Sequence, residues 1–309
     1  MKVFFKWLGS GVACLALFYF FTEFKGQMGK ALPLVMDLKN LPWLLLCAIG
    51  VVPHMAFAGI AWQRILLIVG VTMRPLIAMR ILFISQLARY IPGNVGHHVG
   101  RLVLAKQEGV PLKVGTVTIL IETFIILSLS ALISLIAFPE YFYQFYKENS
   151  LGGILIGAVV CLVIIVCVLI WKWPVLMQKI DIKYVRSILA EMKVTRFIEI
   201  SICYMVNFLF TGAVAWILAT QIFGDTSLGF LYLMSIMTFS WIVGFLTPGA
   251  PAGLGVREVI ALWLLSRAYA PDVAVSLVVL HRVVLTVGDL FTFLIGLGLS
   301  GIKEKPVLV

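Results

Sequence analysis

Long apolar runs separated by short polar segments set the pattern of this chain. Six of the runs are long enough for an α-helix to cross a bilayer, which takes about 20 residues. The pattern therefore predicts an all-α polytopic membrane protein, folded as a single transmembrane domain over residues 1–309. The predicted spans are Phe4–Phe21, Leu41–Ala61, Val114–Phe138, Leu151–Trp171, Phe197–Ile222 and Val273–Leu299.

Two further apolar stretches, at about 75–105 and 228–265, are interrupted in the middle by a Pro-Gly pair. Each could form two short crossings, or one re-entrant hairpin that enters and leaves the membrane on the same side. Glycine and proline crowd both tips, and a broken backbone exposed to lipid would leave polar groups unsatisfied. We therefore predict two re-entrant hairpins.

The two interrupted stretches carry the same short motif. The first reads PGNVGHHVGR from Pro92 to Arg101, and the second reads PGAPAGLGVRE from Pro248 to Glu258. In each, an arginine follows the first proline by nine residues. Three predicted spans separate the hairpins, so the repeat halves at about 75–138 and 228–299 have opposite orientations, as in many transporters.

Composition and charge indicate where the protein is located. The chain is 62% hydrophobic and 12% charged, so its net charge of +10 does not indicate a nucleic-acid partner. Basic residues of membrane proteins gather on the cytoplasmic side. The segment 172–196 holds six of them, which predicts a multi-pass protein of the bacterial cytoplasmic (inner) membrane with both termini inside: Lys172, Lys179, Lys183, Arg186, Lys193 and Arg196.

The motifs resemble the family of lysylphosphatidylglycerol synthase transmembrane regions. The resemblance lies in RYIPGNVGHHVGR (Arg89–Arg101), in ETF at Glu122 and in TPGAPAGLGVRE (Thr247–Glu258). It implies a lipid-translocating fold with two inward-pointing hairpins, and substrates with anionic head groups such as aminoacylated phosphatidylglycerol or polyprenyl-phosphate-linked sugars. Aminoacyl-lipid synthases carry a soluble catalytic domain after the membrane part. Here we expect a stand-alone membrane region without it, which puts synthase activity in doubt.

Charged residues at membrane depth are the first candidates for a substrate site. Arg101 and Arg257 follow the glycine-rich tips, where they could bind a head-group phosphate or extend to the interface. Glu122 and Arg282 stand at matched positions after the hairpins, 160 residues apart. They could bind substrate, or pair with each other as a gate or a structural contact.

Further candidates surround these four residues. Asp289 shares a helical face with Arg282, and Glu258 could pair with Arg282 or Arg267. His97, His98 and Asn94 could contact a head group, while a metal site is not expected, because no third ligand has suitable spacing. The residues of the tips could offer backbone N–H groups to phosphate or allow close helix packing: Pro92, Gly93, Gly96, Gly100, Pro248, Gly249, Gly253 and Gly255.

These observations favour a flippase for a lipid with a phosphate-containing head group, either a phospholipid or a polyprenyl-phosphate-linked sugar. One alternative is an integral membrane transferase with Glu122 or Glu258 as its base. Another is a non-transporting partner of a separate lipid synthase. We expect no cofactor and no catalytic residue for a flippase. The expected partners are the lipid substrate, the bilayer, and either a second copy of the chain or a lipid-modifying enzyme.

Overall fold

The described part of the protein is built almost entirely from helices. The computed structural model describes residues 37–90, 96–148, 194–247 and 251–301, together with Pro33 and the pair 307–308. The only strands in these ranges, β1 (Val71–Thr72) and β2 (Val307–Leu308), form a short antiparallel pair. The predicted all-α class is confirmed.

Four long helices are apolar enough to cross a membrane. They correspond to four of the six predicted spans, and the other two, Phe4–Phe21 and Leu151–Trp171, lie outside the described residues. Two of these long helices are continued by a short helix each, η2 (Leu218–Ile222) after the third long helix and η4 (Leu299–Gly301) after the fourth. The long helices are α2 (Leu41–Ile68), α5 (Leu112–Glu148), α8 (Val194–Ile217) and α11 (Pro271–Gly298).

Helix α2 continues past the predicted end at Ala61, and its last turns bury a Gln63 side chain whose Nε2 is hydrogen-bonded and whose Oε1 has no partner. Gln63 is buried, and its amide Nε2 donates to the backbone carbonyl of Met73, 3.0 Å away in the turn that follows the helix. A buried amide with a partner does not end an apolar helix.

Each of the two interrupted stretches folds as a pair of short helices. Three of the four arms have 10 to 12 residues and are too short to be independent crossings, because a 12-residue helix is about 18 Å long and the hydrocarbon layer is about 30 Å thick; the fourth arm has 17 residues. This length favours the re-entrant interpretation. The first pair is α3 (Pro75–Gln86), η1 (Leu87–Tyr90) and α4 (Gly96–Gln107); the second is α9 (Phe230–Leu246), η3 (Pro251–Gly253) and α10 (Val256–Leu265).

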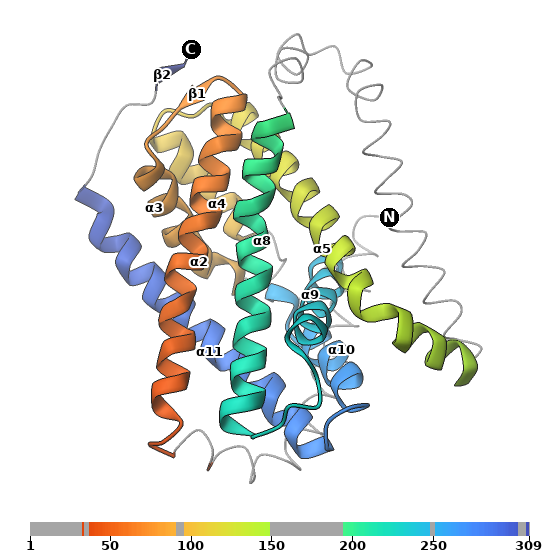
Figure 1. Cartoon of the computed structure of the whole chain (residues 1–309). Helices are drawn as coiled ribbons and strands as arrows, with labels where there is room; N and C mark the ends of the chain where they lie inside the picture. Colours follow the sequence, from red (N-terminus) through yellow and green to blue (C-terminus); the bar gives the residue numbers. More distant parts are fainter. Residues whose placement is uncertain are drawn as a thin grey trace.

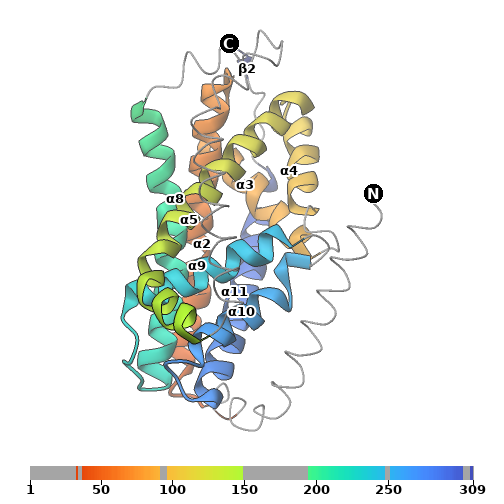
Figure 2. The same ribbon diagram turned by 90° about the vertical axis from the view of Figure 1, so that its right-hand side faces the viewer.

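The two hairpins enter the helix bundle from opposite ends. In both ribbon views α3 and α4 occupy the upper half of the molecule and α9 and α10 the lower half (Figures 1 and 2). Their tips η1 and η3 are in contact. Helices α2 and α8 run antiparallel to each other through the full height of the bundle (Figure 1). The arrangement places the two repeated motifs together near the middle.

Glycines allow the helices to approach closely. A Cβ atom on Gly59 of α2 would lie 2.8 Å from the backbone of Met79 in α3. Gly212 of α8 meets Met234 of α9 in the same way, and Gly288 of α11 meets Val51 of α2. Small residues at such crossings are typical of helix packing in membranes, where van der Waals contact replaces the hydrophobic effect between helices.

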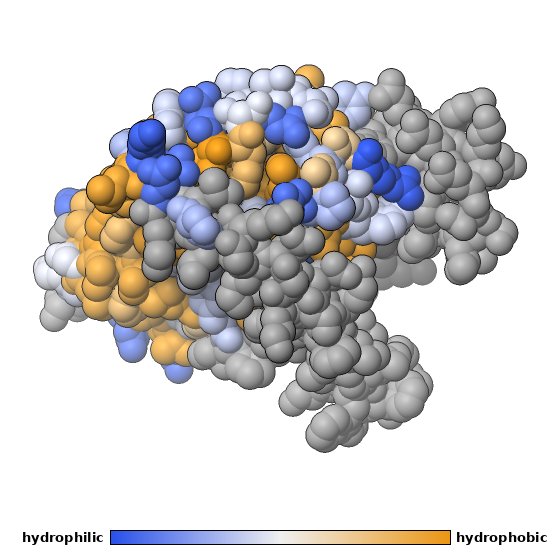
Figure 3. All heavy atoms as spheres, turned by 90° about the horizontal axis from the view of Figure 1, so that it is seen from below, coloured by the Kyte–Doolittle hydropathy of each residue, from blue (hydrophilic) through white to orange (hydrophobic). Residues whose placement is uncertain are grey.

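The outer surface of the bundle is strongly apolar. Large side chains such as Ile49 of α2, Ile202 of α8 and Leu294 of α11 are more than half exposed. Figure 3 shows apolar side chains gathered in a broad field on one flank of the molecule. A surface of this kind fits a hydrocarbon environment, which is consistent with the membrane class.

The crossing of α2 and α11 gives a test of this packing. We predict that Gly288→Ala lowers the free energy of unfolding by about 1–3 kcal/mol, because the new methyl group overlaps Val51 and the carbonyl of Ala48. The midpoint of thermal unfolding in detergent measures the effect. Gly298→Ala on the same helix is the control, since its Cβ meets nothing within 4 Å. Equal midpoints for the two variants would contradict the close crossing.

Candidate functional site

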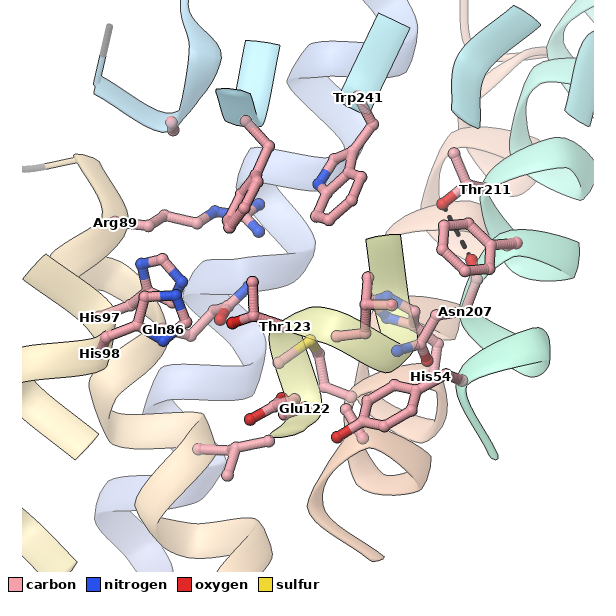
Figure 4. A pocket seen from close by; sticks show the side chains of 18 of the residues that line it. His54, Gln86, Arg89, His97, His98, Glu122, Thr123, Asn207, Thr211 and Trp241 are labelled. Carbon is pink, nitrogen blue, oxygen red and sulfur yellow. Dashed lines mark hydrogen bonds between the residues drawn. The ribbon is translucent and has the colours of Figure 1, made fainter. Parts of the chain in front are cut away.

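A polar cavity lies where the two hairpin tips meet the long helices. Its volume is about 170 Å³, and a second cavity of about 110 Å³ adjoins it. Both are lined by His54, Arg89, Thr211, Trp241 and Arg257. Residues from both halves of the repeat therefore face a common space inside the bundle (Figure 4).

Arg101 of the first motif is neutralised inside its own half of the repeat. Its Nη1 donates to Oε2 of Glu122 in α5, and both side chains are about 95% buried. The guanidinium also lies over the ring of Trp62, 5.4 Å from the centroid, and the Trp62 indole donates to the Thr118 hydroxyl at 3.1 Å. Burial with a partner and an aromatic face fixes Arg101 against the wall of the cavity.

The second half of the repeat contains the same kind of pair with the charges exchanged. Here the hairpin helix α10 supplies Glu258, and the following helix α11 supplies Arg282, with Nε 3.4 Å from Oε1. Arg282 also donates a long hydrogen bond of 3.5 Å to the carbonyl of Ala252 in η3. Of the two partners predicted for Glu258, Arg282 is confirmed, while Arg267 stacks over Trp263 instead.

The expectation of a direct pair between Glu122 and Arg282 is wrong. Each forms an ion pair inside its own half of the repeat, because the hairpin helix that packs beside it already presents the opposite charge. Matched depth therefore does not bring the two side chains together. It places them in equivalent pairs.

Asp289 ties the tip of the first hairpin to α11. Its carboxylate accepts from Arg89, from the Tyr90 hydroxyl at 2.7 Å and from the Gln86 amide at 3.4 Å. The side chain is 2% exposed, as expected for a polar residue that faces the interior. Sequence reasoning selected Asp289 but missed Arg89, although this arginine stands three residues before Pro92.

Arg257 forms no ion pair with any described residue. Its guanidinium lies 5.7 Å from the Trp241 ring centroid, and its Nε is buried without a hydrogen-bond partner. Two glycines make room for the side chain, since a Cβ on Gly253 would lie 2.6 Å from that Nε and one on Gly244 would overlap Cγ. Gly253 also has φ +70°, which a side chain would disfavour. The glycines of this tip thus create space for the arginine.

The histidine pair of the first motif lies on the cavity wall beside Arg89 (Figure 4). The rings of His97 and His98 are tilted by 38° against each other with centroids 3.8 Å apart, and Nδ1 of each is buried without a hydrogen-bond partner. Across the described ranges no group of three His, Cys, Asp or Glu side chains is placed to hold a metal ion. The pair is therefore available to a ligand in the cavity.

The other predicted tip residues divide into two groups. Gly96 begins α4, Gly255 precedes α10 with φ +82°, and Gly100 packs against α3, where its Cβ would lie 3.4 Å from Cβ of Ser85. The remaining predicted residues lie outside the described part of the chain: Pro92, Gly93, Asn94, Pro248 and Gly249.

Helix α8 supplies a second polar wall. Tyr204, Asn207 and Thr211 stand at helical spacing in the sequence, a pattern that is more often typical of contacts between helices. All three line the cavity, and Oδ1 of Asn207 has no hydrogen-bond partner. Thr238 of α9 adds a fully buried hydroxyl, also without a partner. The signal was present in the sequence, but only the fold shows which way these side chains point.

The fold and the cavity define a helical membrane protein with an arginine-lined cavity between two pairs of short helices. The chain belongs to the family described as the lysylphosphatidylglycerol synthase TM region, whose sequence profile matches residues 6–296. A search of curated proteins finds none that matches the chain.

The ion pairs make a prediction about coupling. Arg101→Met or Glu122→Leu alone should cost about 3–5 kcal/mol of stability, since each leaves a buried charge without its partner, and the double variant should recover most of the loss. A double-mutant cycle on unfolding in detergent measures this coupling. The cycle for Glu122 and Arg282 is the control, and its single effects should add to within about 0.5 kcal/mol. Strong coupling in the control, with additivity between Arg101 and Glu122, would contradict the pairing.

Proposed function

We propose that this protein is a flippase, which moves a lipid with a phosphate-containing head group across the cytoplasmic membrane. The cavity would hold the head group while the hydrocarbon tails stay in the surrounding lipid. The substrate could be a phospholipid or a polyprenyl-phosphate-linked sugar, since the two share a phosphate next to a long apolar tail.

The observation that carries this proposal is the unpaired Arg257. A guanidinium inside a membrane domain is costly unless an anion accompanies it. The other three arginines of the cavity each have a carboxylate partner, whereas Arg257 has none among the described residues. Its planar fork of donors suits a phosphate, and Trp241 holds one face of it in place.

The arrangement of the hairpins supports transport rather than simple binding. Short helices that reach the middle from opposite ends, in inverted halves, are how many transporters build a site that opens to either side. The tips η1 and η3 meet at the cavity. Movement of one hairpin against the other would open the cavity to one side of the membrane at a time.

The alternative of a transferase fits the site less well. A general base needs a carboxylate that is free to take a proton at the reacting atom. Glu122 and Glu258 are both held by arginines and are 5% and 6% exposed. Such pairs favour a structural role for these carboxylates over proton transfer.

The charges at the two ends of the bundle support an orientation with the termini inside. The turns and helix ends at the upper end carry Arg74, Lys106, Lys113 and Arg196 together with Glu108. The turns at the lower end carry Asp37, Asp225 and Asp272 together with Lys39 and Arg267. By the positive-inside rule the upper end would face the cytoplasm.

Arg257→Gln tests the proposal. In proteoliposomes with acyl-labelled NBD-phosphatidylglycerol, dithionite quenching should show that the variant moves lipid at least about tenfold more slowly than the unmodified protein, because one unmatched charge is worth about 1.4 kcal/mol or more. Arg257→Lys should recover only part of the rate.

Arg267→Gln is the matched control, since this arginine stacks on Trp263 outside the cavity. It should leave the rate unchanged. Normal movement with Arg257→Gln would remove this residue from the site. Movement no faster than in protein-free vesicles, for the unmodified protein with both phosphatidylglycerol and an isoprenyl phosphoryl hexose, would remove the flippase proposal itself.

A further inference from the structure

We infer that the lipid of this flippase is a phosphodiester with one negative charge, whose head group is uncharged and carries hydroxyl groups. This inference rests on the proposed function and narrows it to one substrate class. Phosphatidylglycerol and a polyprenyl-phosphate-linked hexose share this chemistry. An aminoacylated lipid, whose head group bears ammonium groups, does not.

The charges that line the two cavities leave room for a single anion. Four arginines face three carboxylates, so one positive charge is left unbalanced: Arg89, Arg101, Arg257 and Arg282 against Glu122, Glu258 and Asp289. The tip segments 91–95 and 248–250 contain no ionisable residue that would alter this balance. A ligand with one negative charge makes the site neutral, and neutrality at membrane depth is favoured.

The site offers no carboxylate to an ammonium group. Asp289, Glu122 and Glu258 are 2%, 5% and 6% exposed, and each is bonded to an arginine. The second oxygen of Glu258 has no hydrogen-bond partner, but the negative charge of this carboxylate is already balanced by Arg282. The cations are the more accessible groups, with Arg89 and Arg282 at 19% and 16%. A lysyl head group would therefore meet arginines and no counter-charge, which selects against it.

The wall opposite the arginine and histidine side chains has the chemistry of a hydroxyl-binding site. Figure 4 shows Asn207 and Thr211 on the far side of the cavity from Arg89, His97 and His98. Oδ1 of Asn207 and the hydroxyl of Thr238 both lack protein partners, and Thr238 is 0% exposed. Buried polar atoms of this kind are normally satisfied, so a ligand that brings hydroxyl groups fits them. The phosphate would lie at Arg257 and the hydroxyl groups near Asn207 and Thr238.

The first test compares lipids that differ only in the head group. Four acyl-labelled NBD lipids are used with the unmodified protein: phosphatidylglycerol, phosphatidylethanol with the same charge but no hydroxyl, phosphatidylethanolamine, and lysylphosphatidylglycerol. We expect phosphatidylglycerol to move at least about tenfold faster than lysylphosphatidylglycerol, and measurably faster than phosphatidylethanol. A water-soluble short-chain isoprenyl phosphoryl hexose, scored by uptake into the vesicles, shows which of the two lipid sources the protein prefers.

Two variants test the two halves of the inference. Asn207→Asp adds a carboxylate to the cavity and should reduce the preference for phosphatidylglycerol over lysylphosphatidylglycerol by about tenfold. Gln221→Glu is its control, because the same change falls on an exposed residue at the end of η2. Thr238→Val keeps the shape but removes the hydroxyl, so it should abolish the advantage of phosphatidylglycerol over phosphatidylethanol.

The outcomes separate this inference from the proposed function. Movement of lysylphosphatidylglycerol at the rate of phosphatidylglycerol, with both rates lost in Arg257→Gln, overturns the inference and leaves the flippase standing. Equal rates for phosphatidylglycerol and phosphatidylethanol overturn its hydroxyl half. An absence of movement for every lipid removes both. The comparison of lipids uses only the unmodified protein, so it can overturn the inference even if a variant fails to fold.

Discussion

The cost of an unpaired charge inside a membrane domain governs this structure. Three arginines and three carboxylates near the middle of the bundle meet this cost by pairing, and each pair ties a hairpin to a long helix. Arg101 and Glu122 hold α4 to α5, Arg282 and Glu258 hold α11 to α10, and Asp289 holds the first tip to α11 through Arg89. Among the arginines of the described cavity, only Arg257 is left for a ligand, so the ion pairs both build the cavity and define its charge.

The predicted repeat accounts for the way one site arises from two pairs of short helices. Each half supplies a glycine-rich tip, a short helix with a charged residue and a long helix with its partner, and the signs of the pair are exchanged between the halves. The second hairpin differs from the first because a glutamate directly follows the arginine of its motif, as Arg257 and Glu258. Glu258 faces Arg282, while Arg257 lies against Gly253 and Trp241. This asymmetry leaves one arginine without a carboxylate partner among the described residues of the site.

Much of this arrangement could be predicted from the sequence, and the failures have physical causes. Apolar run length predicted α2, α5, α8 and α11, and the repeated Pro-Gly motif predicted two broken stretches with a matched arginine in each. The partners of those arginines could not be predicted, because pairing depends on which helices pack together, as Glu122 and Arg282 show. The role of Asn207 was also hidden, since a polar residue in an apolar helix can face either a neighbouring helix or a cavity.

The central claim is that the two hairpins reach one cavity from opposite faces of the membrane. Cysteine labelling tests it most directly, in a chain whose five native cysteines are replaced. Thr226 and Gln107 are exposed residues next to the second and first hairpins. The opposed hairpins predict that a membrane-impermeant maleimide labels Thr226→Cys in intact cells, and labels Gln107→Cys only after the membrane is opened. Labelling of both positions from the same side would contradict the inverted arrangement and the shared site that depends on it.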